Sequence, residues 1–261
     1  PFLYEQWQPH QLDYVKKQLE ALIGTAEIIA GKTMQAAQFE RVMRRAKDAT
    51  ELWLQILEMG RYHPSPITAF DEYILMAPIV DLRGEQNCVD FYAGLLRELQ
   101  QRVEKGEGAI RQERYRVLWD NLPVWFKIGR MSRFFAERHV SVVASTYTYA
   151  WGEIAPLLNV NQPLDSMAKA YLYPILNRSA GQKLTAMKTL VEKFSIDGVL
   201  LHSDKSCKPY SLGQIDQRDE IIHQLNKPAM LLHGDHNDSR AYSDEQAQTR
   251  IEAFIEMMEA A

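Results

Sequence analysis

The hydrophobic period of the chain changes near residue 110, and this change constrains the fold more than any other feature of the sequence. Over residues 8–102 apolar side chains such as Leu12 and Val15 recur at three- or four-residue spacing, which predicts amphipathic helices. After Gly108 short apolar runs alternate with amphipathic stretches, which is typical of a parallel sheet with crossover helices. We therefore expect an α/β protein, with a mainly helical region at 1–109 and an α/β domain at 110–261.

Four apolar runs in the second half are expected to be strands, because each is apolar enough to be covered on both faces. These runs are 115–119, 140–144, 198–201 and 229–232. They predict a parallel, doubly wound sheet of four or more strands, similar to flavodoxin or Rossmann folds. Helices are expected at 124–138, 181–194, 213–225 and 244–259, the last opened by a capping box of Ser243 and Gln246. Residues 147–178 are interpreted as an insertion with mixed helix.

Turn-forming residues divide the first half of the chain. Gly24 and the run Gly31-Lys32-Thr33 are expected to separate two helices, with Thr33 as the N-cap of the second. The two prolines at 63–66 are expected to break the chain before another helix, and 84–105 to form a further helix.

Charge and motif content argue against several classes of protein. The net charge of −4 gives no basic excess for nucleic acid or a membrane surface, and no apolar run reaches the roughly 18 to 20 residues that span a bilayer. The first residues lack a signal-peptide pattern, so we expect the cytoplasm. Cys88 and Cys207 are the only cysteines, too few for a disulfide framework or a complete iron-sulfur site. Sequence motifs for NAD, ATP or serine hydrolysis are absent.

The loop at 202–210 carries the first candidate site residues, because ligands of open α/β sheets bind beyond the carboxyl ends of the strands. Cys207 approaches the start of a helix with Lys205 and Lys208 beside it. We therefore expect a lowered thiol pKa and a thiolate suited to metal binding. The alternative is an inert thiol packed beneath the loop. Cys88, inside a helical segment without close basic neighbours, is expected only to pack.

The loop at 233–240 concentrates histidine and aspartate side chains. Two histidines and two aspartates lie within six residues, which suggests a divalent-metal site, although aspartates also satisfy turn amides and cap helices. We favour a role in orienting the neighbouring loop or a substrate. His233 and His236, together with His202 from the previous loop, are the candidate proton donors or orienting groups.

Aromatic residues follow the second and first strands. Tyr147, Tyr149 and Trp151 alternate, so they either line an aromatic pocket or continue the strand over the core. The helix at 124–138 combines aromatic and basic residues, which either attract an anionic cofactor such as a CoA phosphate or form a solvated face. The second interpretation is favoured in both cases.

Three blocks in the second half resemble, in order and spacing, the benzoyl-CoA reductase and 2-hydroxyacyl-CoA dehydratase family. They are Asp197-Gly198-Val199, Ser206-Cys207-Lys208-Pro209-Tyr210-Ser211-Leu212-Gly213-Gln214, and Asp235-x-x-Asp238-x-Arg240-x-x-Ser243-x-x-Gln246-x-x-Thr249-Arg250-x-x-Ala253-Phe254. The segment 116–123 and the pair Ser145-x-Tyr147 are also similar. The resemblance covers most of 110–261 and, more faintly, the helices before it.

The resemblance implies a [4Fe-4S] cluster with Cys207 as one ligand, and a CoA thioester as substrate. Lys205, Lys208 and Tyr147 are the candidate cofactor-binding residues. The other cluster cysteines of the family belong to an N-terminal α/β domain that precedes a segment like 1–31, so we expect that domain to be missing here. The expected partners are a homologous second iron-sulfur subunit, an ATP-hydrolysing iron-sulfur activator and ferredoxin as electron source.

The activity that the resemblance implies is a low-potential, one-electron reduction of an acyl-CoA. The segments 208–214 and 119–123 look closer to the reductase branch, which predicts a benzoyl-CoA reductase subunit. One alternative is a 2-hydroxyacyl-CoA dehydratase, which eliminates water by a radical mechanism. A second alternative is a non-catalytic scaffold subunit or truncated paralogue.

Overall fold

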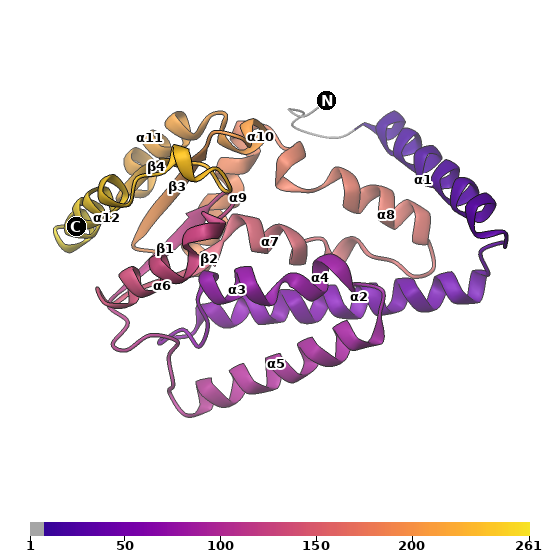
Figure 1. Ribbon diagram of the computed structural model, residues 1–261, viewed down its shortest axis with the longest axis horizontal. Helices are drawn as coiled ribbons and strands as arrows, with labels where there is room; N and C mark the ends of the chain where they lie inside the picture. Colours follow the sequence, from indigo (N-terminus) through magenta and orange to yellow (C-terminus); the bar gives the residue numbers. More distant parts are fainter. Residues whose placement is uncertain (1–7) are drawn as a thin grey trace.

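Long amphipathic helices form the first half of the computed structural model, which describes residues 8–261. These helices are α1 (Pro9–Ala30), α2 (Ala36–Glu58), α3 (Ala69–Leu75), α4 (Ala77–Asp81) and α5 (Gln86–Glu104). Helices α2 and α5 run side by side (Figure 1), and Trp53 packs on Tyr92 between them with ring centroids 5.2 Å apart. The helical period of the sequence therefore identified this half of the fold.

Two details of the first half differ from the sequence prediction. Gly24 lies inside α1, which runs unbroken to Ala30, because one glycine costs a helix only about 1 kcal/mol. Thr33 is not an N-cap, because α2 begins three residues later after Gln35. Gly31 does end α1, with a left-handed φ of 63°.

The second half forms a four-stranded sheet in which every neighbouring pair is parallel. The strands are β1 (Tyr115–Asp120), β2 (Val140–Ser145), β3 (Gly198–Asp204) and β4 (Ala229–Gly234), in the spatial order β2-β1-β3-β4. All four predicted strands are present. The prediction of an α/β protein with a helical first part and a parallel sheet is confirmed.

Helices cover both faces of the sheet. Val117 and Trp119 of β1 face the side packed by α3, α6 (Ile128–Ala136) and α12 (Asp244–Glu259). Leu118 faces the opposite side, packed by α9 (Ala180–Lys193) and α11 (Gln214–Leu225). This alternation explains why the strands read as continuous apolar runs, because each buries both of its faces.

Shorter helices fill the predicted insertion and its surroundings. Helix α7 (Thr146–Gly152) follows β2 directly, α8 (Pro163–Leu172) packs on α1 as Figure 1 shows, and α10 (Lys208–Ser211) is a single turn after β3. Tyr147, Tyr149 and Trp151 therefore lie on a helix, so the interpretation of a continued strand is wrong. None of the described helices is both long and apolar enough to cross a membrane.

The connections reverse direction between β1 and β3. From β1 the chain passes through α6 on one face to β2, whereas from β3 it passes through α11 on the other face to β4. Loops that leave the two strands in opposite directions open a crevice at their carboxyl ends, where ligands of such sheets bind. The candidate site is built at this edge.

Candidate functional site

A buried carboxyl group marks the carboxyl end of β1. Asp120 is only 3% exposed, and its oxygens accept hydrogen bonds from Thr146 Oγ1 and Gln214 Nε2, each at 2.8 Å. Burial raises the pKa of Asp120, although these hydrogen bonds oppose the shift. The sequence analysis did not single out this residue, because an aspartate after a strand resembles an ordinary turn residue.

Asn121 joins β1 to the loop after β3. Its backbone has a φ of 80°, in the left-handed region that asparagine tolerates better than most residues. Its side-chain amide donates to the His202 carbonyl at 2.8 Å and to Ser211 Oγ at 3.2 Å, while its backbone N–H donates to Thr146 Oγ1 at 3.1 Å. One fully buried side chain thus fixes the distance between the two strands that flank the crevice.

His202 lies at the bottom of this edge and has no exposed surface. Its Nδ1 is 2.6 Å from the Leu122 carbonyl, so Nδ1 carries the proton and donates it. Nε2 is then an acceptor, and it has no partner among the described residues. Burial lowers the pKa of His202, which favours the neutral ring. Of the two predicted roles, this position favours orientation of the loop over proton donation.

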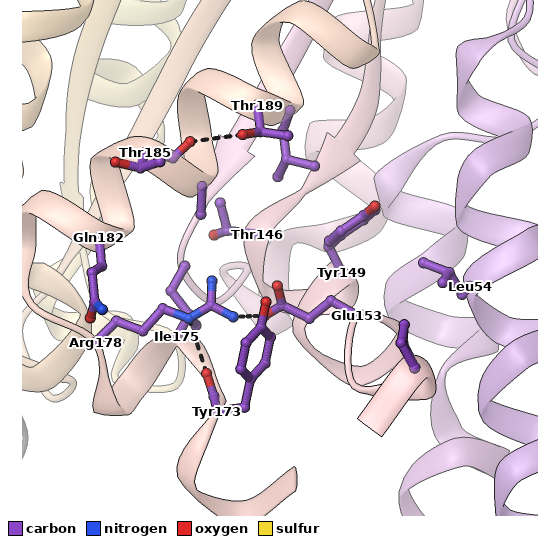
Figure 2. Close-up of a pocket in the computed structure, with 13 residues that line it drawn as sticks. Leu54, Thr146, Tyr149, Glu153, Tyr173, Ile175, Arg178, Gln182, Thr185 and Thr189 are labelled. Carbon is purple, nitrogen blue, oxygen red and sulfur yellow. Dashed lines mark hydrogen bonds and ion pairs between the residues drawn. The ribbon is translucent and has the colours of Figure 1, made fainter. Parts of the chain in front are cut away.

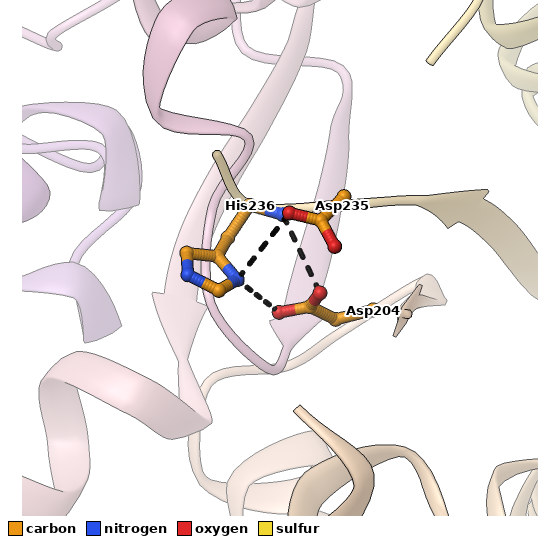
Figure 3. Close-up of side chains that lie close together, drawn as sticks. All are labelled: Asp204, Asp235 and His236. Atoms are coloured by element: carbon orange, nitrogen blue, oxygen red, sulfur yellow. Dashed lines mark hydrogen bonds and ion pairs between the residues drawn. The ribbon is translucent and has the colours of Figure 1, made fainter. Parts of the chain in front are cut away.

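His236 is held by two aspartates at the ends of β3 and β4 (Figure 3). Its Nδ1 is 2.8 Å from Asp204 Oδ2 and 3.8 Å from Asp235 Oδ1. Asp204 is buried, whereas the His236 side chain is 29% exposed. A buried carboxylate on Nδ1 fixes the ring and leaves the other nitrogen toward the crevice, which is the arrangement of an oriented acid or base.

Asp235 is saturated by the turn that it begins. Oδ1 accepts the backbone N–H groups of Asn237 and Asp238 at 2.9 and 2.8 Å, and Ser206 Oγ donates to the other oxygen. Burial alone would raise the pKa of Asp235, but these hydrogen bonds hold it well below its ordinary value. Asp204, Asp235 and His236 offer ligand atoms within 4.8 Å of one another, yet these bonds already occupy the Asp235 carboxylate. We therefore interpret the group as an anchored imidazole.

Cys207 lies at this edge, half-buried, directly before the single turn α10. Burial raises the pKa of its thiol, although the Tyr210 amide and the Lys183 charge oppose the shift. This direction is opposite to the sequence expectation. A one-turn helix supplies little dipole, and Lys205 and Lys208 are exposed, where water screens their charge. The thiol is therefore protonated when no metal is bound.

Lys183 is a buried cation that the sequence analysis missed. It reaches from α9 to the loop after β3, where its Nζ donates to the Pro209 carbonyl, and it is only 3% exposed. Burial lowers its pKa, while Asp120 and Cys207 favour its charged form. A signal was present, because Lys183, Met187 and Leu190 share the buried face of α9 at helical spacing.

The other candidate residues are separated from this edge or already paired. Tyr147 packs edge-on against Trp125 at 6.2 Å, in the apolar contact between the helical layer and the sheet, which fits core coverage and not an open aromatic pocket. Lys127 and Arg130 both bind Asp244, at 2.7 and 2.6 Å. Their helix face therefore has little charge to offer an anionic cofactor.

A second cavity, of about 520 Å³, lies between α7 and α9 beside the candidate site. Thr146, which bonds Asp120, is one of its lining residues. Figure 2 shows Arg178 paired with Glu153 across this cavity at 2.8 Å, with Tyr173 against the guanidinium. The pair neutralises both charges, so the cavity presents hydroxyl and apolar groups without a free ion.

Comparison with known proteins identifies the relatives of this chain. The model of the family described as 2-hydroxyglutaryl-CoA dehydratase, D-component, matches residues 1–258. The chain belongs to this family. The dehydratase and reductase resemblance seen in the carboxyl-terminal blocks is thereby confirmed at the level of the family.

Individual members of the family are similar along nearly the whole chain. The alpha subunit of the (R)-2-hydroxyisocaproyl-CoA dehydratase of Clostridioides difficile is 32% identical over 95% of the chain and 60% of the relative. The alpha subunit of the (R)-2-hydroxyglutaryl-CoA dehydratase of Acidaminococcus fermentans is 28% identical over 95% and 51%. One subunit of the benzoyl-CoA reductase of Thauera aromatica is 28% identical over 95% and 60%. The chain thus spans between half and three fifths of these curated relatives.

The thiols of this family member contribute to a cluster site without completing one. Cys207 is the one thiol at the sheet edge among the described residues, because Cys88 is buried in α5 with its Sγ 3.3 Å from the Pro78 carbonyl. A [4Fe-4S] cluster is held by a set of cysteine thiolates. Within the described part of the chain, Cys207 fits as a single contributor, and the other ligands would have to come from elsewhere.

Proposed function

We propose that the chain is part of a 2-hydroxyacyl-CoA dehydratase subunit that acts on a CoA thioester. The observation that carries the proposal is Cys207, next to the Asp204–His236 pair at the crevice of a sheet whose sequence belongs to this family. The family description and two of the three relatives above carry dehydratase names, which favours this branch over the reductase.

The proposed roles of the residues follow from their surroundings. Cys207 would supply one ligand of a [4Fe-4S] cluster, which, when bound, delivers electrons of low potential to the thioester. His236, fixed by Asp204 through Nδ1, would exchange a proton with substrate through Nε2. His202 and Asn121 would hold the two loops at a constant separation. His233, Lys205, Lys208 and Tyr147 keep their predicted roles as donor or binding residues.

The proposed partners follow from the same family assignment. They are a homologous second iron-sulfur subunit, an ATP-hydrolysing iron-sulfur activator and ferredoxin, in the cytoplasm. A further α/β domain with the remaining cluster cysteines is expected to belong to the same subunit.

A benzoyl-CoA reductase subunit is the second candidate, supported by the Thauera aromatica relative. Turnover of benzoyl-CoA against a 2-hydroxyacyl-CoA, with reduced activator and ATP, separates the two. Exclusive turnover of benzoyl-CoA would overturn the dehydratase proposal. Turnover of neither substrate by the complete complex would instead favour a non-catalytic scaffold.

Replacement of each cysteine tests the ligand assignment. Cys207→Ala in the complete subunit should lower the iron content and abolish the electron paramagnetic resonance signal of the reduced cluster. Cys88→Ala is the control, because its thiol lies in the helical core, and it should keep both. Unchanged iron in Cys207→Ala would refute the assignment.

A further inference from the structure

A small cavity of about 190 Å³ lies next to the candidate site, at the carboxyl end of the edge strand β4. Three basic side chains from three segments line it: Lys205 after β3, His233 in β4 and Arg250 in α12. Ser243 and Gln246 from the start of α12 complete its polar wall. The cavity is therefore enclosed by groups that are far apart in the sequence.

The lining of this cavity is rich in donors and has no acidic member. Within the described part of the chain, no carboxylate lies within 4.0 Å of the basic nitrogens of Lys205, His233 or Arg250. Arg250 uses one nitrogen to donate to the Leu231 carbonyl at 3.3 Å, which fixes the guanidinium and leaves its other donors free. A rigid guanidinium with free donors suits an oxyanion with several acceptor oxygens.

The neighbouring charges leave the cavity positive. Asp244, the first acidic residue of α12, is already bound by Lys127 and Arg130. Glu245 accepts a hydrogen bond from Ser243 Oγ at 3.1 Å and is not part of the lining. The N-terminus of a sixteen-residue helix adds partial positive charge at the same place. Arg250 and Lys205 also lower the pKa of His233, after the effect of burial, which shows that the three groups lie close enough to repel one another.

We propose that Lys205, His233 and Arg250 form a phosphate-binding subsite. The geometry that supports the proposal is the convergence of three unpaired basic side chains on one small cavity. In the context of the proposed function, on which this part of the inference rests, the phosphate would be one of those of the CoA thioester. The backbone N–H of Lys205 donates to the Gly234 carbonyl at 3.1 Å, so the subsite is tied to the loop that carries Cys207.

Binding measurements with single-residue variants test the subsite. Dissociation constants of CoA, dephospho-CoA and inorganic phosphate would be measured by calorimetry on the complete protein and on Arg250→Gln and Lys205→Gln. Each variant should weaken CoA binding about tenfold, as expected for loss of one charge-assisted hydrogen bond. Lys227→Gln, at the opposite end of β4, is the matched control and should bind as the parent does. Circular dichroism and thermal melting would establish that the variants fold.

The ligands separate the sources of phosphate. Weaker binding of CoA with unchanged binding of dephospho-CoA assigns the 3′-phosphate, and equal weakening of both assigns the pyrophosphate. Weaker binding of inorganic phosphate alone assigns free phosphate, which keeps the subsite but removes its link to the thioester. Unchanged binding of all three ligands in both variants overturns the subsite. Because no turnover is involved, this result is independent of whether the dehydratase assignment fails.

Discussion

The two ends of the sheet both bury charged groups, but they use them differently. At the amino end, Arg116 is 2% exposed, and its guanidinium donates to Glu113 and to the carbonyls of Gly60, Tyr62 and Phe194. At the carboxyl end, Asp120, His202 and Asp204 are equally buried. There, however, His202 Nε2 and Gln214 Oε1 have no partner among the described residues.

The difference separates a structural buried charge from one suited to function. Around Arg116 the protein itself satisfies the guanidinium, and the bonds join the helical layer to β1, so burial there serves cohesion. At the carboxyl end, spare acceptors remain next to an oriented imidazole and a thiol. Unsatisfied buried groups cost free energy, so their presence at a crevice favours a site that a ligand completes.

The largest effect is expected at the closed end. Arg116→Met should lower the free energy of unfolding by about 3–5 kcal/mol, because the Glu113 carboxylate stays buried without its main partner. Urea denaturation measures the change. Arg114→Met is the control, because its exposed pair with Glu259 should contribute less than about 1 kcal/mol. Similar denaturation midpoints for the two variants would show that the amino end is not the structural one.

A large effect on activity with little effect on stability is expected at the open end. His236→Gln should reduce kcat of the complete enzyme by about 100-fold or more, because the oriented proton donor or acceptor is lost. The free energy of unfolding should change by less than about 1 kcal/mol, since the ring is partly exposed. His223→Gln, on the exposed face of α11, should leave both unchanged. A variant with full kcat would remove His236 from the proton-transfer proposal.

A smaller, pH-dependent effect is expected from Glu72, which lies between α3 and α7. Burial raises its pKa from 4.5 to about 8, against an opposing hydrogen bond from Thr148. Between these values the folded protein keeps the proton and the unfolded chain loses it, so stability falls as the pH rises through this window. Glu72→Gln should remove this dependence, which amounts to at most about 1.4 kcal/mol per pH unit.

Urea denaturation at several pH values between 5 and 8 (about one unit apart) would measure the slope for Glu72→Gln. Glu104→Gln, at the exposed end of α5, changes the net charge by the same amount and should keep the parental slope. An identical slope in parent and Glu72→Gln would mean that Glu72 ionises normally in the folded protein.

Much of this architecture could be predicted from the sequence because strands buried on both faces carry apolar side chains without interruption. The four strands and the helix Asp244–Glu259 were found in this way. The loops with Cys207 and His236 were found because the carboxyl ends of parallel strands share one edge. Lys183 could have been found too, since it interrupts an apolar helix face. The division into domains and the roles of the site residues stay predictions.

Asp120, Glu72 and the pKa of Cys207 could not be predicted, because each depends on neighbours remote in the chain. Asp120 is bound by Gln214, and Glu72 by Thr148, across 94 and 76 positions. The sequence showed lysines beside Cys207 but not the depth of the thiol. Desolvation by burial then outweighed the charges and reversed the expected shift.

The sequence by itself determined the elements, their order along the chain and the family, because period and motif spacing are local properties. Only the tertiary structure decided how three histidines of similar appearance differ. His202 is buried with Nδ1 bound, His233 borders a basic cavity, and His236 is fixed by Asp204. Burial and hydrogen bonding set the proton affinity of an imidazole, and both arise from packing between β1, β3 and β4.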